Sequence, residues 1–294
     1  MADASGDDGA LRERLVDELV RDGAVTTVAV EAALRAVPRH LFVPGVDLEL
    51  AYANQAIPTK VEDGVPVSSA SQPSIVAIML EQLAVRAGDR VLEIGAGTGY
   101  NAALLARLAA PGGRVVAVDI DDDIVDAARL HLEAAGVEDV EVVCGDGALG
   151  HLAGAPYDRV VATVGIWDIP PAWWEQLAPR GRLVAPISLG GGVQRSVALE
   201  QRGGRLESVS VRDCGFMRLR GPFAGAETMV AAGPVRLVFD AEVDEAAVQA
   251  ALDRPAEERV LDVEAAPSEV FGGLALWLAL HNPGAGTAQA MWAE

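Results

Sequence analysis

The stretch VLEIGAGTGY, residues 91–100, decides the fold. It begins as a short apolar run interrupted by Glu93, and glycine then occupies every second position at Gly95, Gly97 and Gly99. A helical pattern, NAALLARLA, follows directly. Glycine adopts backbone conformations that other residues avoid, and it lets another group approach the main chain closely. The stretch predicts a strand that turns sharply into a helix, either for structural reasons alone or to admit a ligand against the turn.

Segments of alternating strand and helix character extend outward from this turn. We expect strands at residues 90–96, 113–120, 140–146, 157–165 and 181–189, and helices at 100–109, 123–136 and 170–178. Such alternation is typical of parallel β-α-β units with helices on both faces of the sheet. The run at 193–211 has Gly203 and Gly204 near its centre and predicts an antiparallel hairpin.

The flanking regions have weaker patterns. Residues 10–37 predict two helices broken near DGAVT, with Thr26 or Thr27 as the N-cap of the second. The prolines of VPRHLFVPG predict a loop or a short extended segment, and residues 50–72 predict an irregular chain before a helix from Ser74 to Leu83. Beyond Phe223, short patterns predict a small α+β unit with elements at 234–240, 243–254, 258–263 and 268–281.

Composition narrows the class of function. The chain has 23 Lys and Arg against 43 Asp and Glu, a formal net charge of −20. This charge disfavours nucleic acid as a partner, because binding to phosphates needs a basic surface. The N-terminus is unlike a secretory leader, and no apolar run approaches the roughly 20 residues of a membrane span, so we expect a cytoplasmic protein that binds no membrane. Two cysteines, Cys144 and Cys214, and four histidines without HExxH spacing predict no metal site.

Acidic residues at the ends of three successive strands point to the ligand. The third glycine comes two residues after the second, whereas the dinucleotide fingerprint requires three. The spacing is similar to the E-x-G-x-G-x-G loop of S-adenosylmethionine-dependent methyltransferases. Asp119, which ends the next strand, can accept hydrogen bonds from ribose hydroxyls, and Asp146 lies where the adenine edge is expected. We predict S-adenosyl-L-methionine as cofactor and S-adenosyl-L-homocysteine as product, bound by Glu93, Gly95, Ala96, Gly97, Thr98, Gly99, Asp119, Ile120, Asp146, Gly147 and Thr163.

Longer strings resemble the protein-L-isoaspartate O-methyltransferase family. The resemblance runs from about residue 10 to 221, and it is carried by AVPRHLFVP (36–44), AYANQAIP (51–58), SQPSIVAIMLEQL (71–83), VLEIGAGTGYNAALLA (91–106), GDGALG (145–150) and APYDRVVATVGIWDIPPAWWEQLAPRGRLVAPI (155–187). The strings before the glycine loop are not shared with methyltransferases in general. The resemblance implies a Rossmann-like class I methyltransferase fold and transfer of a methyl group to an aspartate or isoaspartate side chain of a peptide or protein.

The same resemblance implies which residues meet the acceptor. The family signature T-I-S-Q-P appears here as Ser69-Ala70-Ser71-Gln72-Pro73 and keeps a hydroxyl at both polar positions. Ser71 and Ser69 are therefore the implied catalytic residues that contact the substrate carboxylate, and Gln72 and Trp167 are further substrate-binding residues. The alternative is that the serines only cap the following helix. An ionised carboxylate is itself the nucleophile at neutral pH, so the task is positioning and no catalytic His or Lys is expected.

Three features depart from the family's repair enzymes: a longer, more polar segment at 58–73, Trp167 where small residues are common, and about 70 residues beyond Phe223. They resemble a subgroup associated with ribosomally made, modified peptides. That resemblance implies methylation of an aspartate in a precursor peptide and collapse of the ester to an aspartimide, and we favour this function, with general isoaspartyl repair as the alternative. Three arginines could receive an acidic peptide or could simply be solvated: Arg212, Arg218 and Arg220.

The intact glycines and Asp119 disfavour a non-catalytic cofactor-binding module, and the match through residues 36–83 disfavours a small-molecule O-methyltransferase.

The fold class expected is α/β, a mostly parallel doubly wound sheet with an antiparallel C-terminal hairpin, N-terminal helices and a C-terminal accessory domain. We expect three parts: an N-terminal helical segment and substrate loop at 1–75, the methyltransferase domain at 76–222, and an α+β accessory domain at 223–294. The sequence leaves the oligomeric state open.

Overall fold

The structure, a computed structural model, describes residues 5–62, 64–190, 192–225, 228–232, 235–239, 242–255, 264, 266, 269–281 and 287–290. Its centre is a seven-stranded sheet with the order β5-β4-β3-β6-β7-β8-β9. Five strands run parallel: β3 (Arg90–Ile94), β4 (Arg114–Asp119), β5 (Val140–Cys144), β6 (Tyr157–Ala162) and β7 (Leu177–Ser188). The hairpin of β8 (Gln194–Arg202) and β9 (Arg205–Cys214) adds an antiparallel edge. The α/β, doubly wound fold and its antiparallel hairpin are confirmed.

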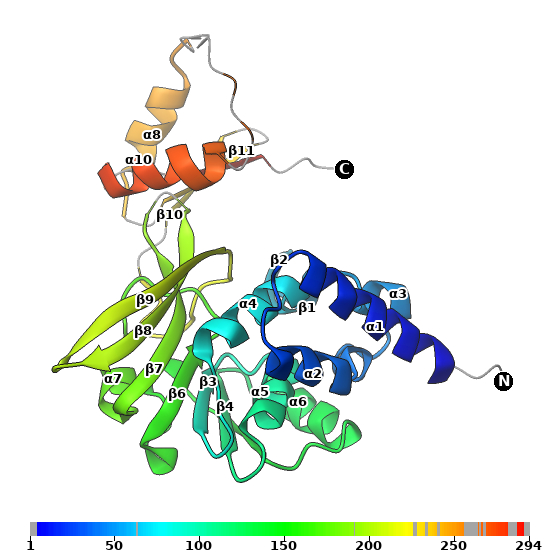
Figure 1. The fold of residues 1–294 in the computed structure, drawn as a ribbon. Coiled ribbons are helices and arrows are strands. Elements are labelled where there is room, and N and C mark those ends of the chain that lie inside the picture. The colour runs from blue at the N-terminus through cyan, green and yellow to red at the C-terminus, as the bar shows by residue number, and fades with distance from the viewer. Residues whose placement is uncertain are drawn as a thin grey trace.

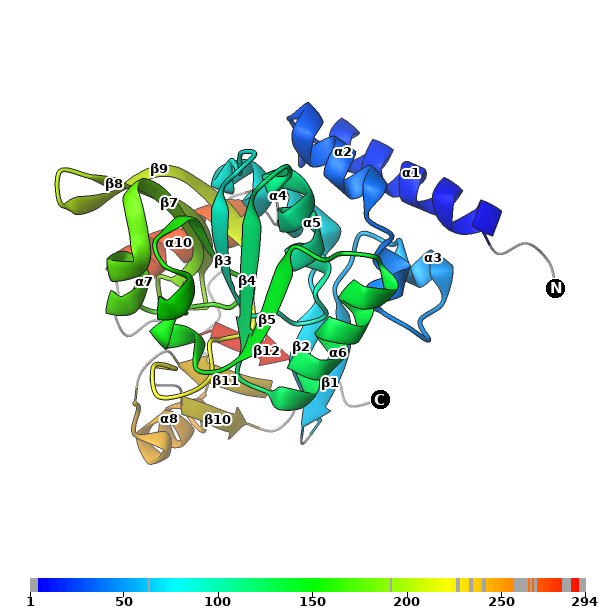
Figure 2. The same cartoon turned by 90° about the horizontal axis from the view of Figure 1, so that it is seen from below.

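Helices cover both faces of this sheet (Figures 1 and 2). One face packs against α4 (Pro73–Leu83), α5 (Tyr100–Ala109) and α6 (Asp122–Ala134), and the other packs against α7 (Pro171–Gln176) and the 3-10 helix η2 (Gly147–Leu149). A second 3-10 helix, η3 (Leu152–Gly154), has no buried residue. Neighbouring strand residues serve different cores, because side chains alternate across a strand. Val91 packs toward α5, whereas Leu92 packs toward α7.

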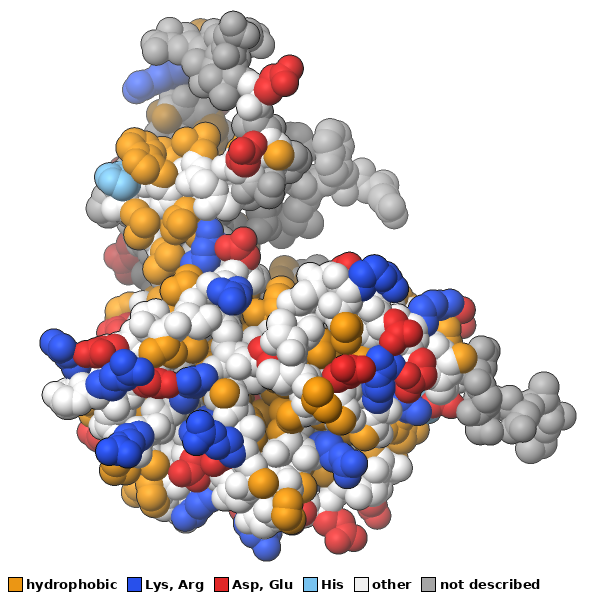
Figure 3. Space-filling model, viewed as in Figure 1, with side chains coloured by type: hydrophobic (Ala, Val, Ile, Leu, Met, Phe, Trp, Pro, Cys, Tyr) orange, Lys and Arg blue, Asp and Glu red, His pale blue; other side chains and the backbone are white. Residues whose placement is uncertain are grey.

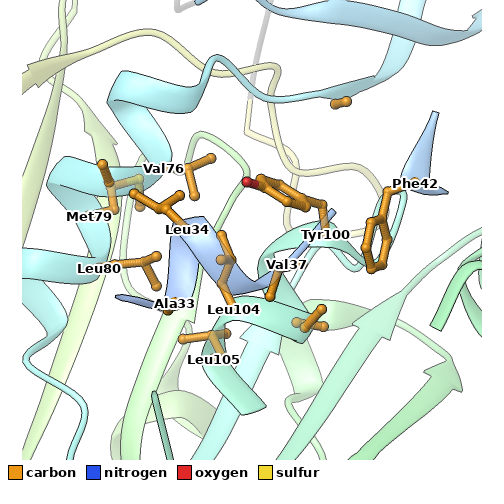
Figure 4. Close-up of a cluster of buried hydrophobic side chains, with 14 of the residues drawn as sticks. Ala33, Leu34, Val37, Phe42, Val76, Met79, Leu80, Tyr100, Leu104 and Leu105 are labelled. Atoms are coloured by element: carbon orange, nitrogen blue, oxygen red, sulfur yellow. The ribbon is translucent and has the colours of Figure 1, made fainter. Parts of the chain in front are cut away.

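The N-terminal helices α1 (Ser5–Arg21) and α2 (Val28–Ala36) extend the first of these cores. Figure 4 shows Leu34 of α2, Leu80 of α4 and Leu104 of α5 in one buried cluster. Burial of each such leucine stabilises the fold by about 1.5–3 kcal/mol, so these helices fold against the sheet. The two helices are confirmed, and Thr27 is the N-cap of α2, since its Oγ1 accepts a hydrogen bond from the Val30 amide at 3.4 Å.

Two segments differ from the sequence prediction. Residues Arg39–Phe42 form a 3-10 helix, η1, where a loop or extended chain was expected. After the short helix α3 (Leu48–Ala51), the stretch expected to be irregular contains a hairpin of β1 (Ile57–Glu62) and β2 (Val65–Ala70). Its prolines are tolerated because both strands of a two-stranded sheet are edges, where a missing N–H can face outward. The hairpin brings the predicted substrate serines to the sheet.

The C-terminal part lies beside the β8–β9 end of the sheet (Figure 1). It contains the antiparallel strands β10 (Thr228–Ala232), β11 (Val235–Phe239) and β12 (Thr287–Ala290), with α8 (Glu245–Leu252), the π-helix η4 (Val270–Leu274) and α10 (Ala275–His281). β11, α8 and η4 with α10 match the patterns expected there, whereas β10 and β12 were not predicted. The element predicted at 258–263 lies outside the described residues.

Candidate functional site

A cavity of about 570 Å³ opens at the carboxyl ends of β3, β4 and β6. In doubly wound sheets this edge is where ligands bind. Three segments distant in sequence complete its walls, namely the end of β2 with the start of α4, the glycine loop after β3, and residues 213–220 after β9. Twelve of the predicted site residues line it: Ser69, Ser71, Gln72, Glu93, Gly95, Ala96, Gly97, Thr98, Asp119, Ile120, Gly147 and Thr163.

The three glycines of the loop have different surroundings, so a side chain would be excluded at each for a different reason or not at all. Gly95, at φ +95°, packs so tightly that a Cβ there would lie 2.7 Å from Thr163 Oγ1. Gly99, at φ +86°, faces α6, where a Cβ would lie 3.3 Å from the Ala128 carbonyl oxygen. Only Gly97 faces open space, with Ser69 O at 3.8 Å as the nearest atom to a Cβ. Gly99 does not line the cavity, and its close approach to α6 gives a packing reason for a glycine at this position.

Asp119 at the end of β4 braces the glycine loop. Its Oδ2 accepts a hydrogen bond from the Gly97 amide at 2.9 Å. The side chain is buried, and burial raises the pKa of its carboxyl while the backbone N–H groups of Gly97, Asp121 and Ile120 oppose that rise. Asp119 therefore holds the loop open at Gly97 and presents a carboxylate to the cavity, as a partner for hydroxyl groups.

Glu93 on β3 has an unused hydrogen-bonding atom at the cavity. Its Oε1 accepts a hydrogen bond from Asn101 Nδ2 at 2.8 Å, whereas its buried Oε2 has no hydrogen-bond partner among the described residues. Burial is the main cause that raises the pKa of this carboxyl to about 8. A buried acceptor of this kind is costly unless a donor reaches it. An ammonium group, such as that of the methionine portion of the predicted cofactor, is the donor that fits.

Besides Gly99, two predicted site residues lie outside the cavity lining. Asp146 caps η2 by accepting the Ala148 amide at 2.9 Å. Trp167 is 53% exposed, stacks on Phe223 with ring centroids 5.3 Å apart, and donates from Nε1 to the Phe223 carbonyl at 3.1 Å. Trp167 thus contacts the beginning of the C-terminal part, and the prediction that it lines the substrate site has no support in this geometry.

The predicted acceptor serines take no part in capping α4. The N-cap of α4 is Gln72, which makes no side-chain capping bond, and the Ser74 amide donates to Asn54 Oδ1 at 3.0 Å. Neither Ser69 nor Ser71 caps this helix, so the capping alternative is wrong. Both serines line the cavity together with the glycine loop.

An ion-pair bridge that the sequence reading missed crosses one side of the site. Asp121 accepts from Lys60 Nζ at 2.9 Å and from Arg220 Nη2 at 2.7 Å, and Lys60 also bonds Asp123 at 2.9 Å. This ion-pair bridge connects β1, the chain after β4 and the loop after β9. The three arginines named above do not act as one cluster, because Arg218 and Arg220 line the cavity and Arg212 does not.

No group of His, Cys, Asp and Glu in the described part of the chain is arranged to hold a metal ion. Among the same residues, no helix has the length and apolar character needed to cross a membrane.

Comparison with known proteins supports a specific family. The family profile described as "Protein-L-isoaspartate(D-aspartate) O-methyltransferase (PCMT)" matches residues 10–222. A protein-L-isoaspartate O-methyltransferase of Methanoculleus marisnigri is 44% identical over 212 residues, 72% of this chain and 92% of its own length. One from Methanoregula boonei is 41% identical over 212 residues, 72% of this chain and 94% of its own length.

Solved structures agree on the fold. A protein-L-isoaspartate O-methyltransferase aligns with a TM-score of 0.67 and 26% identity, over 80% of this chain and 86% of its own. One from Plasmodium falciparum, solved in complex with S-adenosyl-L-homocysteine, aligns with a TM-score of 0.61 and 17% identity, over 71% of this chain and 98% of its own.

Proposed function

The chain belongs to the protein-L-isoaspartate(D-aspartate) O-methyltransferase family, and we propose that it methylates the side-chain carboxylate of isoaspartate in peptides and proteins. Its relatives carry this activity in their names, which supports general repair over the modified-peptide role favoured from the sequence. The enzyme class is that of S-adenosylmethionine-dependent carboxyl O-methyltransferases, and the cofactor is S-adenosyl-L-methionine.

One observation carries the proposal: the predicted acceptor residues and the predicted cofactor residues line a single cavity. Ser69 and Ser71 share it with Gly97 and Asp119, and the Ser69 carbonyl oxygen would lie 3.8 Å from a Cβ at Gly97. The cofactor supplies an electrophilic methyl group when bound, and the acceptor carboxylate needs no base because it is already ionised at neutral pH. Hydroxyl donors orient such a carboxylate without protonating it. Correct orientation can lower the barrier by roughly 7–11 kcal/mol.

The residues that hold the cofactor follow from the same geometry. The orphaned Oε2 of Glu93 would accept from a cationic amino group, Asp119 would accept from the ribose hydroxyls, and the open side of Gly97 would admit the nucleoside. Ile120 and Gly147 also line the cavity, and we assign them to the adenine. Gln72, at the N-cap of α4, lies beside the acceptor serines.

The test is a methyl-transfer assay with a linear isoaspartyl peptide and the same peptide containing ordinary aspartate. We expect turnover of the isoaspartyl peptide. Ser71→Ala should lower kcat/KM by about 10- to 100-fold, the equivalent of one hydrogen bond to a charged group, and leave cofactor affinity unchanged. Ser74→Ala is the matched control, because Ser74 lies outside the cavity lining. A wild-type rate in Ser71→Ala would remove Ser71 from the mechanism.

A second candidate function is supported by the part of the chain that the family profile does not cover. The profile stops at residue 222 of 294, and the relatives named above align over 92–94% of their own length. The accessory domain proposed at 223–294 would suit an enzyme that recognises one modified precursor peptide and converts its aspartate into an aspartimide. Turnover of a cyclised aspartyl precursor with loss of water, and none of the linear isoaspartyl peptide, would favour this role over repair.

A further inference from the structure

A buried arginine without a counter-ion lies directly behind the serine wall of the cavity. Arg39, in η1, is 1% exposed. Its Nε donates to the Ala51 carbonyl at 3.0 Å, and its Nη2 donates to the carbonyls of Ser71 at 2.9 Å and Ala70 at 3.4 Å. Its Nη1 is buried and has no hydrogen-bond partner in the described part of the chain. Arg39 is thus connected to the backbone of the acceptor serine.

The positive charge of Arg39 is offset only in part. Arginine stays protonated in proteins, and a buried charge is normally paired with an opposite one. The described carboxylates make no ion pair with Arg39. Burial lowers the pKa of its guanidinium, and the ionisable groups of Tyr100 and Tyr52 oppose that shift. The guanidinium carbon lies 4.9 Å from the centre of the Tyr100 ring, a favourable contact that leaves the net charge unchanged.

The two residues that Arg39 contacts both line the cavity and come from different segments of the chain. Ser71 directly precedes the N-cap of α4, and Tyr100 follows the glycine loop as the first residue of α5. Because Arg39 bonds one and stacks on the other, it fixes their separation. Such a separation sets the distance between a bound carboxylate and a methyl donor, and rates depend steeply on that distance.

We infer that Arg39 is a positioning residue for the acceptor: it fixes the backbone of Ser71 against Tyr100, and its uncompensated positive charge favours a carboxylate over a neutral group at the serine wall. This inference rests on the proposed function, since it assumes that the acceptor carboxylate binds at Ser69 and Ser71. The inference predicts two effects that can be measured separately. The position of the Ser71 backbone should affect turnover, and the charge of Arg39 should affect the selectivity for an acceptor carboxylate.

The experiment compares two peptides that differ only in charge. Calorimetry of the full-length protein loaded with S-adenosyl-L-homocysteine gives the Kd of a linear isoaspartyl peptide and of its isoasparaginyl amide, and methyl-transfer assays give kcat and KM for the first. We expect wild type to prefer the carboxylate on the order of tenfold or more. Arg39→Met should bring the ratio of the two Kd values close to one. Arg39→Lys should preserve the ratio and lower kcat, because it keeps the charge and loses the planar fork.

Arg159→Met is the matched control. Arg159 also donates to backbone carbonyls, those of Ala84 and Asp158, but it pairs with Asp89 and lies outside the cavity lining. The Arg159→Met variant should be less stable than wild type, but the ratio of its Kd values for the two peptides should be unchanged. If Arg39→Met does not fold, Arg39→Gln replaces it. An unchanged ratio in a folded, neutral Arg39 variant overturns the inference while the proposed function stands. Absence of wild-type turnover of the isoaspartyl peptide overturns both.

Discussion

The part of the chain up to residue 222 and the part beyond it are built differently. The first contains two continuous cores on the faces of one sheet. In the second, Val230 and Ala279 are the only buried hydrophobic residues among those described, whereas the η4–α10 segment exposes large apolar side chains: Val270, Leu274, Trp277, Leu278 and Leu280. Figure 3 shows such side chains gathered on this part of the surface. Every residue that lines the cavity belongs to the first part.

The difference teaches that the cavity, with the proposed cofactor and acceptor sites, is formed by the well-packed part alone. Its walls are held by buried contacts such as those of Asp119, Glu93 and Arg39, whose geometry depends on the sheet. The second part touches this body at a few points, including the Trp167–Phe223 stack and a bond from Arg195 Nη2 to the Gly272 carbonyl at 3.2 Å. Changes in the two parts should therefore have effects of very different size.

The largest effect is expected for Asp119→Ala. The substitution removes the acceptor for the Gly97 amide and the proposed ribose contact, so we expect cofactor affinity to fall by about 100-fold or more, as for loss of two hydrogen bonds to a carboxylate. Calorimetric titration with S-adenosyl-L-homocysteine measures this. Asp146→Ala is the control, because Asp146 follows β5, caps η2 and lies outside the cavity lining. Equal losses in both variants would contradict the assignment of Asp119.

Glu93→Gln should change stability and cofactor affinity in opposite directions. The pKa of Glu93 is raised to about 8 from 4.5 by burial, so between these pH values the folded protein binds a proton that the unfolded chain releases. The free energy of unfolding of the wild type must therefore fall as pH rises through this window. Glutamine is neutral at every pH, so the variant does not lose this stability. Denaturant unfolding without cofactor should show Glu93→Gln to be more stable by a few kcal/mol at pH 8 and equal at pH 4.5.

The same variant should bind the cofactor about tenfold more weakly, because Oε2 no longer offers a charge to an ammonium group. The Asn101 amide can still donate to the glutamine carbonyl, so the local packing is preserved. A variant that binds the cofactor as tightly as wild type would show that Glu93 has only a structural role.

A smaller effect is expected from the bridge at Asp121. Asp121→Asn weakens the links to Lys60 and Arg220, which hold β1 and the loop after β9 against the cofactor side of the cavity. The neighbouring Arg220 guanidinium is the main cause that lowers the pKa of Asp121, which keeps this carboxylate charged at neutral pH. We expect S-adenosyl-L-homocysteine to dissociate about three- to fivefold faster, since exposed or half-exposed pairs contribute up to about 1 kcal/mol.

Stopped-flow measurement at two salt concentrations checks this effect, because screening should reduce the difference between wild type and Asp121→Asn. Asp126→Asn is the control, since the exposed pair of Asp126 with Arg129 lies on α6 away from the cavity. A dissociation rate that stays at the wild-type value in low salt would show that the bridge does not retain the cofactor.

The sequence predicted what depends on local pattern and missed what depends on distant contacts. The strand–helix alternation and the glycine turn are encoded in short periods, so the sheet and the position of the cavity followed from them. The hairpin at 57–70 was hidden by its prolines, whose tolerance depends on which N–H groups face outward. The bonds from Asp121 to Lys60 and Arg220 span 61 and 99 residues, and no local pattern marks such pairs. Arg39 stood within a quoted motif, but only its burial without a counter-ion reveals its significance.

The smallest effect is expected from removal of the second part. A chain that ends at residue 225 keeps both cores, the cavity and the Trp167–Phe223 stack. If the proposed boundary near 222 separates two domains, kcat/KM on a linear isoaspartyl peptide should change by less than about threefold, the equivalent of under 1 kcal/mol. The unfolding midpoint of the truncated chain should stay close to that of the full chain, because a domain with its own core folds alone. A large loss of turnover on this small substrate would mean that the second part supports the cavity itself, whereas a loss confined to a cyclised precursor would assign it to recognition of that peptide.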